Sequence, residues 1–94
     1  MRKAYLLVYA DSLGSRDQVK TCVDSLPEIV AWRYDMPHCF YLISEYDADD
    51  IVQSIIEYFN NKGRFIVAEV TDNKQGWLPE NTWYLLNKKY YKKD

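Results

Sequence analysis

The sequence predicts an α+β fold: a ferredoxin-like βαββαβ sandwich, with a four-stranded antiparallel sheet, two helices on one face and a short C-terminal helix. Three observations predict it. Four short runs of apolar, branched and aromatic residues are typical of strands. Segments with helical apolar spacing follow the first run and the third. This order is the split βαβ pattern, and right-handed crossovers then place the first and third strands at the centre of the sheet.

The first strand is predicted over residues 4–10 (AYLLVYA), which a polar loop follows. Ser15 suits the N-cap of the first helix, and Asp17 in the first turn suits the positive end of the helix dipole. The apolar stripe of this helix at i, i+3, i+4 and i+7 consists of Val19, Cys22, Val23 and Leu26. Pro27 ends the helix, because the residue before a proline is disfavoured in the helical region.

The second and third strands are predicted over residues 29–34 (IVAWRY) and 39–44 (CFYLIS). The four residues between them form a short turn, so we expect the two strands to pair as a hairpin. His38 lies in this turn and is the only histidine in the chain. Without a second histidine, neither a zinc site nor a histidine-paired nucleophile has its usual parts. We therefore interpret His38 as a turn residue.

A second helix is predicted over residues 48–61, with Asp47 as its cap. Its wide apolar face consists of Ile51, Val52, Ile55, Ile56 and Phe59. Gly63 suits the left-handed position that ends a helix, and residues 64–71 (RFIVAEVT) form the fourth strand.

The chain is expected to form one domain over residues 1–94, since this length is typical of a single small domain. Residues 1–71 make up the βαββαβ core. Residues 72–94 add a polar loop, a short helix over residues 80–87 and a basic tail.

Composition excludes several classes of protein. The net charge of −2 gives no overall basic surface for nucleic acid. No apolar run approaches the roughly 20 residues of a membrane span, and the N-terminus leads into a strand rather than a signal peptide. Cys22 and Cys39 have no metal-binding spacing, so we expect both to be reduced and structural. These features predict a cytoplasmic protein with no cofactor and no membrane partner.

The helix-free face of the sheet is predicted to be strongly apolar, because the strands alternate poorly between apolar and polar residues. The residues assigned to this face are Tyr5, Leu7, Tyr9, Trp32, Tyr34, Phe65 and Val67. An apolar patch of this kind is rarely left bare. The C-terminal segment, a second copy of the chain or stacked nucleotide bases are three alternative covers. We favour the second copy, in a homodimer through this face.

Two polar clusters are candidate sites. Asp11, with Ser12, Ser15 and Arg16, places a carboxylate and a base beside a helix N-terminus, which can bind an anion. Turn formation and helix capping explain Asp11 and Ser15 completely, and we favour that interpretation. The basic tail is a candidate for nucleic-acid binding through charge and stacking. It contains Lys88, Lys89, Tyr90, Tyr91, Lys92 and Lys93. A solvated chain terminus is the alternative interpretation of the tail.

Three segments carry a resemblance to a known family. They are residues 5–9 (YLLVY), residues 40–44 (FYLIS) and residues 76–79 (GWLP) followed by Trp83. The chain resembles the SinR-like small proteins, ferredoxin-fold relatives of the CRISPR-associated adaptation endoribonuclease-like family and of virulence-associated protein D. The resemblance implies a homodimer packed through its sheets, from a bacterial or phage source and a mobile-element or defence-related setting.

In the nuclease members of that group, an aspartate directly follows the tyrosine that ends the first strand. Paired across the dimer, these carboxylates would hold a divalent metal for phosphodiester hydrolysis. This chain has Ala10 at that position. Asp11 comes one residue later, and in a continuing strand a shift of one residue reverses the side-chain direction.

We therefore expect the chain to be a non-enzymatic interaction module that forms a homodimer. Binding of a different protein is an alternative. A metal-dependent nuclease that uses Asp11 is the first alternative. Non-catalytic nucleic-acid binding through the tail is the second.

Overall fold

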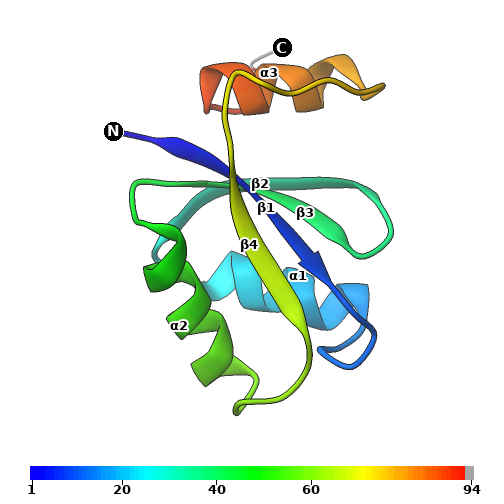
Figure 1. The fold of residues 1–94 in the computed structure, drawn as a ribbon, viewed down its shortest axis with the longest axis vertical. Helices are drawn as coiled ribbons and strands as arrows, with labels where there is room; N and C mark the ends of the chain where they lie inside the picture. Colours follow the sequence, from blue (N-terminus) through cyan, green and yellow to red (C-terminus); the bar gives the residue numbers. More distant parts are fainter. Residues whose placement is uncertain (93–94) are drawn as a thin grey trace.

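Four strands form one antiparallel sheet in the order β2-β3-β1-β4 (Figure 1). Their bounds are β1 Lys3–Tyr9, β2 Ile29–Met36, β3 Cys39–Ser44 and β4 Phe65–Val70. The structure, a computed structural model, describes residues 1–92. The prediction that the first and third strands are central is confirmed.

Three helices complete the α+β fold: α1 Arg16–Ser25, α2 Ala48–Tyr58 and α3 Glu80–Lys88. In Figure 1, α1 and α2 lie below the sheet and α3 lies above it. The described part of the chain, residues 1–92, has no helix that is both long enough and apolar enough to cross a membrane.

Local sequence explains where the first two helices begin and end. Ser15 forms a capping box: its hydroxyl accepts from the Gln18 backbone N–H, and the Gln18 side chain accepts from the Ser15 backbone N–H. The second helix is shorter than predicted. It ends at Tyr58 because Asn60 and Asn61 adopt left-handed backbone conformations, with φ of 57° and 61°.

The main core lies between the sheet and the pair of helices α1 and α2. The sheet contributes the large buried residues Tyr5, Leu7, Phe40 and Leu42, and the helices contribute Val19, Val23, Ile51 and Ile55. Tyr5 keeps its polar tip satisfied, because its hydroxyl donates to the backbone oxygen of Tyr46 at 2.6 Å. Burial raises the pKa of the Tyr5 phenol.

The placement of seven residues on the helix-free face is wrong. All seven pack in the core under α1 and α2: Tyr5, Leu7, Tyr9, Trp32, Tyr34, Phe65 and Val67. The reason is that β1 is apolar on both sides, so its pattern does not say which side meets the helices. Aromatic residues fill this core, where the rings of Tyr34 and Phe40 lie 5.2 Å apart.

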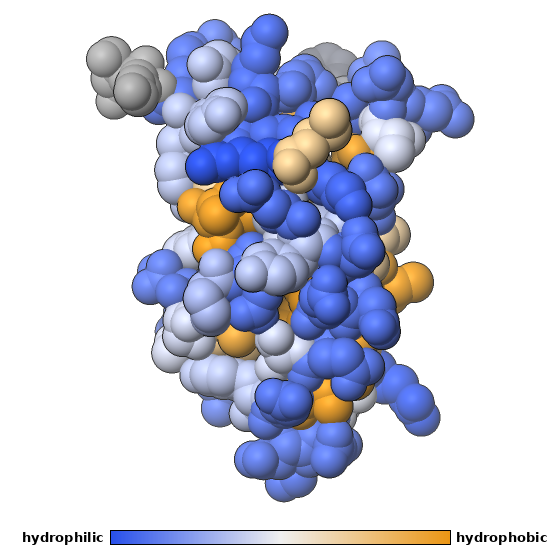
Figure 2. All heavy atoms as spheres, turned by 90° about the vertical axis from the view of Figure 1, so that its left-hand side faces the viewer, coloured by the Kyte–Doolittle hydropathy of each residue, from blue (hydrophilic) through white to orange (hydrophobic). Residues whose placement is uncertain are grey.

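The second face of the sheet is covered in part by the C-terminal segment, one of the three covers considered above. A second buried cluster joins this face to α3, and it contains Ala4, Ala31, Cys39, Tyr41, Ile43, Leu85 and Leu86. Leu6, Val70, Leu78 and Trp83 pack against its margin. On the side shown in Figure 2, hydrophilic residues dominate and hydrophobic ones form small separate patches.

Candidate functional site

Three rows of side chains cross the second face of the sheet, because residues directly opposite each other on neighbouring strands point to the same side. The inner row is Ala31, Ile43, Ala4 and Val70; the middle row is Arg33, Tyr41, Leu6 and Ala68; the outer row is Met36, Cys39, Val8 and Ile66. Each row runs from β2 through β3 and β1 to β4. The three rows differ in what covers them.

The third helix covers the inner row through Leu85 and Leu86. A polar contact fixes it to β2: the Arg33 Nε donates to the hydroxyl of Thr82 at 2.7 Å, and this hydroxyl donates to the Asp35 carboxylate. Thr82 is fully buried, so both of its contacts are shielded from water. This contact therefore fixes the position of α3 over the inner row of the sheet.

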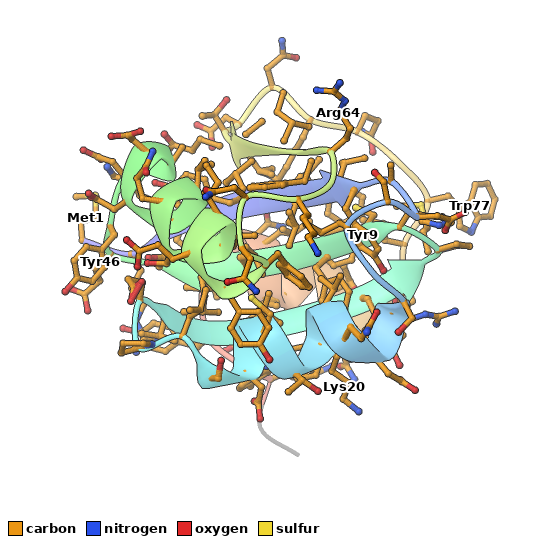
Figure 3. All side chains as sticks on the ribbon, turned by 90° about the horizontal axis from the view of Figure 1, so that it is seen from below. Met1, Tyr9, Lys20, Tyr46, Arg64 and Trp77 are labelled. Carbon is orange, nitrogen blue, oxygen red and sulfur yellow. The ribbon has the colours of Figure 1, made fainter. Side chains whose placement is uncertain are left out.

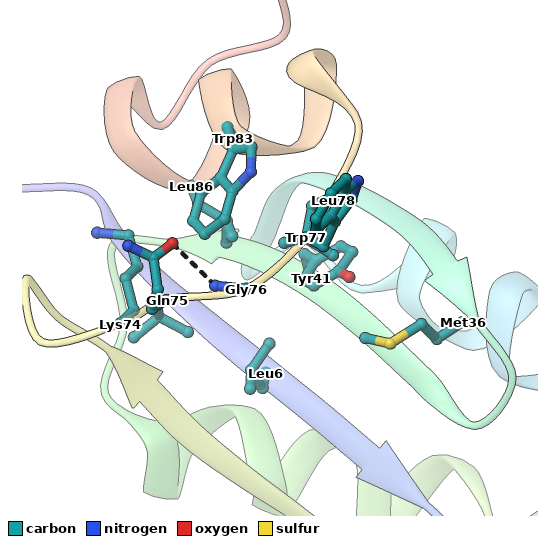
Figure 4. Close-up of a pocket in the computed structure, with 11 residues that line it drawn as sticks. Leu6, Met36, Tyr41, Lys74, Gln75, Gly76, Trp77, Leu78, Trp83 and Leu86 are labelled. Atoms are coloured by element: carbon teal, nitrogen blue, oxygen red, sulfur yellow. Dashed lines mark hydrogen bonds between the residues drawn. The ribbon is translucent and has the colours of Figure 1, made fainter.

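A pocket of about 260 Å³ lies over the middle row, between the sheet, α3 and the segment that leads into α3 (Figure 4). Its walls are mainly apolar. The lining residues are Leu6, Met36, Tyr41, Val70, Lys74, Gln75, Gly76, Trp77, Leu78, Trp83 and Leu86. Each of the four strands contributes a residue to this pocket, and the C-terminal segment contributes the others. The pocket therefore joins parts of the chain that are far apart in sequence.

Tyr41 supplies the buried polar group of this pocket. Its side chain is only 1% exposed, and its hydroxyl has no hydrogen-bond partner among the described residues. Such groups are nearly always paired in native proteins, so this hydroxyl requires an explanation. Burial raises the pKa of Tyr41 to about 12, which keeps the phenol neutral and able to donate a hydrogen bond.

Trp77 stands at the mouth of the pocket with its side chain 100% exposed. Figure 3 shows it projecting from the periphery of the molecule. The neighbouring polar groups are held by the segment itself: Gln75 Oε1 accepts from the Gly76 N–H at 3.0 Å, and Lys74 Nζ donates to the Thr71 carbonyl at 3.2 Å. The mouth of the pocket thus has one exposed aromatic ring, that of Trp77, beside the polar side chains of Lys74 and Gln75, which are hydrogen-bonded to the backbone.

The outer row is left uncovered. Val8, Met36 and Ile66 are 43%, 44% and 61% exposed, and only Cys39 between them is buried. The row contains no charged residue. An apolar strip therefore crosses the sheet from one edge to the other, beyond the reach of α3.

Two residues of the predicted anion site, Ser15 and Arg16, make contacts within the chain. Ser15 is used in the capping box, and the Arg16 guanidinium lies 4.9 Å above the centre of the Tyr34 ring. Anion binding at Ser15 and Arg16 stays a prediction.

Asp11 gains a partner that sequence reasoning missed. Its Oδ1 lies 2.5 Å from His38 Nε2, and His38 has the positive φ of 65° expected of a turn residue. The two are 27 positions apart and meet only because β1 pairs with β3. No group of three or more metal-ligating side chains occurs within residues 1–92.

The basic tail folds back on the chain. The Arg2 guanidinium stacks on the Tyr90 ring at 4.3 Å, and Lys92 pairs with Glu80 at 2.5 Å. That pairing lowers the pKa of Glu80. Lys88 ends α3, and Lys89 caps it in a left-handed conformation; Lys93 lies outside the described residues. Nucleic-acid binding through the tail stays a prediction, and none of these contacts favours it.

Both cysteines are free thiols in buried positions. Cys22 lies on the buried face of α1, where burial raises its pKa to about 12. Burial also raises the pKa of Cys39. Thiols of this kind are poor nucleophiles, so neither is a candidate catalytic residue.

The chain was compared with family models, with curated proteins and with solved structures, and none of the three comparisons found a match. The resemblance to SinR-like proteins therefore stays a prediction.

Proposed function

We propose that this chain is a non-enzymatic interaction module that forms a homodimer through the outer row of its second sheet face. The observation that carries the proposal is the continuous apolar strip of Met36, Cys39, Val8 and Ile66, which crosses all four strands and is exposed at three of its four positions. Exposed apolar strips of this kind are typical of interaction surfaces. The face is the one without α1 and α2, as in the sequence prediction, but its residues are not the seven that the sequence assigned to it.

A second copy is the partner that the strip suits best. The strip carries no charge, so two copies related by a twofold axis can approach without repulsion between like charges. A stable interface buries about 800 Å² on each partner. The interface would therefore extend from the outer row onto the exposed indole of Trp77, which shares the pocket lining with Met36.

We also propose that the fold is ferredoxin-like. The βαββαβ order of the first six elements, the central position of β1 and β3, and the common face of α1 and α2 support this assignment.

Size-exclusion chromatography with light scattering tests the dimer. Ile66→Lys places a charge at the β4 end of the strip, on its most exposed residue, as proteins do to keep strand faces and edges apart. Tyr46→Lys is the matched control, because Tyr46 is an exposed residue in the loop before α2, away from the strip. We expect wild type and Tyr46→Lys to be dimers and Ile66→Lys to be a folded monomer by circular dichroism. A monomeric wild type at high micromolar concentration would refute the proposal.

A metal-dependent nuclease is the second candidate, and the pairing of Asp11 with His38 favours it. Carboxylate and imidazole groups are both ligands of divalent transition metals. Within residues 1–92, a single chain brings only these two ligands together, so a second copy would have to complete the site. Incubation of the protein with RNA and with DNA in Mg²⁺ or Mn²⁺ tests this candidate. Cleavage that disappears in both Asp11→Asn and His38→Gln would favour the nuclease over the non-enzymatic module.

A further inference from the structure

The size and lining of the pocket over the middle row limit what can enter it. Apolar cavities of about 150 Å³ bind a single benzene ring, and pockets for drug-sized ligands begin at about 300 Å³. At about 260 Å³, this pocket lies between these limits. Leu6, Val70 and Leu86 give it apolar walls. A compound of one or two rings therefore fits the available volume.

The Tyr41 hydroxyl adds a second, independent observation that points to a ligand. It belongs to a buried side chain that lines the pocket, and no described residue accepts its hydrogen bond. An unpaired buried hydroxyl costs free energy, which a ligand with a suitable acceptor would recover. Trp77 is the third feature that points to a ligand: its exposed indole lies at the mouth of the pocket, where it can pack against the ring of a bound molecule.

We propose that this pocket binds a small flat apolar molecule of one or two rings that carries a carbonyl group, with the Tyr41 hydroxyl donating a hydrogen bond to the carbonyl oxygen. The Tyr41 phenol keeps its proton at neutral pH, as an ordinary tyrosine does, so its hydroxyl can donate this bond. The proposal goes beyond homodimer formation: Tyr41 lies in the middle row and not in the outer one, although Met36 and Trp77 belong both to the pocket lining and to the proposed interface.

A matched pair of probes tests the proposed hydrogen bond. 2-Acetylnaphthalene carries the carbonyl group, and 2-isopropenylnaphthalene replaces its oxygen with a methylene group of similar shape. Binding to the full ¹⁵N-labelled chain is followed through the indole N–H resonances of Trp77 and Trp83, which line the pocket. Trp32 serves as an internal reference, because its indole donates to Asp24 at a different site.

We expect the wild type to bind the ketone about 2- to 12-fold more tightly than the hydrocarbon, the range of one neutral hydrogen bond. Tyr41→Phe keeps the ring and should bind both probes equally. Tyr84→Phe is the matched control, because Tyr84 is on α3 but outside the pocket lining, and it should keep the preference.

Three results would overturn the proposal: equal affinity of the wild type for both probes, a ketone preference that survives in Tyr41→Phe, or no shift of the Trp77 and Trp83 resonances with either probe. Repeating the titration with Ile66→Lys separates the two proposals. Binding that persists in the monomeric variant supports the pocket whatever the oligomeric state of the wild type.

Discussion

The hydroxyl of Tyr91 makes two hydrogen bonds to the backbone of Trp32: it accepts from the Trp32 N–H at 2.9 Å and donates to the Trp32 carbonyl oxygen at 3.0 Å. Trp32 lies in β2, an edge strand of the sheet. Free backbone groups on an edge strand invite pairing with another chain. One tail residue thus satisfies both groups of Trp32, which favours association through the face of the sheet over association through this edge.

Tyr91→Phe should therefore expose the edge of β2. The variant loses both hydrogen bonds but keeps the ring, so we expect the free energy of unfolding to fall by about 1 kcal/mol. The Trp32 amide should lose protection from hydrogen exchange. Tyr90→Phe is the control, because its ring can still stack under Arg2. An unchanged exchange rate at Trp32 would show that Tyr91 does not occupy this edge in solution.

Tyr41→Phe should have the opposite effect on stability. The unpaired hydroxyl is buried, so its removal relieves a desolvation penalty without breaking a hydrogen bond. We expect the free energy of unfolding in urea to rise by about 1 kcal/mol, while Tyr84→Phe leaves it unchanged. A less stable Tyr41→Phe variant would mean that the hydroxyl has a partner within the folded chain.

Alkaline pH gives a further measurement on the same residue. The pKa of Tyr41 rises from 10.0 in the unfolded chain to about 12 in the folded protein because the ring is buried. Its contribution to stability is complete below pH 10 and is lost as the pH rises towards 12, because the unfolded chain releases the proton first. Between pH 8 and pH 11, this loss amounts to about 1 kcal/mol.

Urea unfolding of wild type and Tyr41→Phe at both pH values isolates this contribution. Cys22 and other buried groups also titrate in this range, and their effect cancels in the difference between the two proteins. We expect the variant to lose less stability than the wild type by the amount given above. An equal loss in both proteins would contradict the burial of the Tyr41 phenol.

Much of the fold is predictable from local sequence, and most of the candidate site is not. The strand runs, the Ser15 cap and the stop at Pro27 depend on neighbouring residues, so the element order follows from them. The assignment of sheet faces fails because it depends on which side of β1 meets the helices, and both sides are apolar.

One signal could have indicated the covered second face. All six residues of β3, Cys39–Ser44, are buried, and the sequence CFYLIS is nearly continuous in apolar residues. A strand of this type is typical of a sheet with both faces covered. No local pattern, by contrast, brings Asp11 to His38 or Tyr91 to Trp32, because these contacts depend on the assembled sheet and on the path of the tail.

The anchor of α3 provides the last prediction. Thr82→Val keeps the volume of the side chain but removes the hydroxyl that joins Arg33 to Asp35. Because these partners are partly buried, we expect a loss of about 1–3 kcal/mol in the free energy of unfolding. Thr21→Val is the matched control: its hydroxyl contacts only the Asp17 carbonyl on the exposed side of α1, so stability should change little.

The same variant should also open the pocket, because α3 and the segment before it form its upper wall. We expect faster limited proteolysis within residues 72–79 in Thr82→Val than in Thr21→Val, and a red shift in the fluorescence of Trp83 as water reaches its ring. Destabilisation with unchanged proteolysis would place the effect in the whole fold and not in the docking of α3. If the segment 72–79 is cleaved under conditions in which the rest of the protein is still folded, Thr82 is the residue that holds α3 on the second face of the sheet.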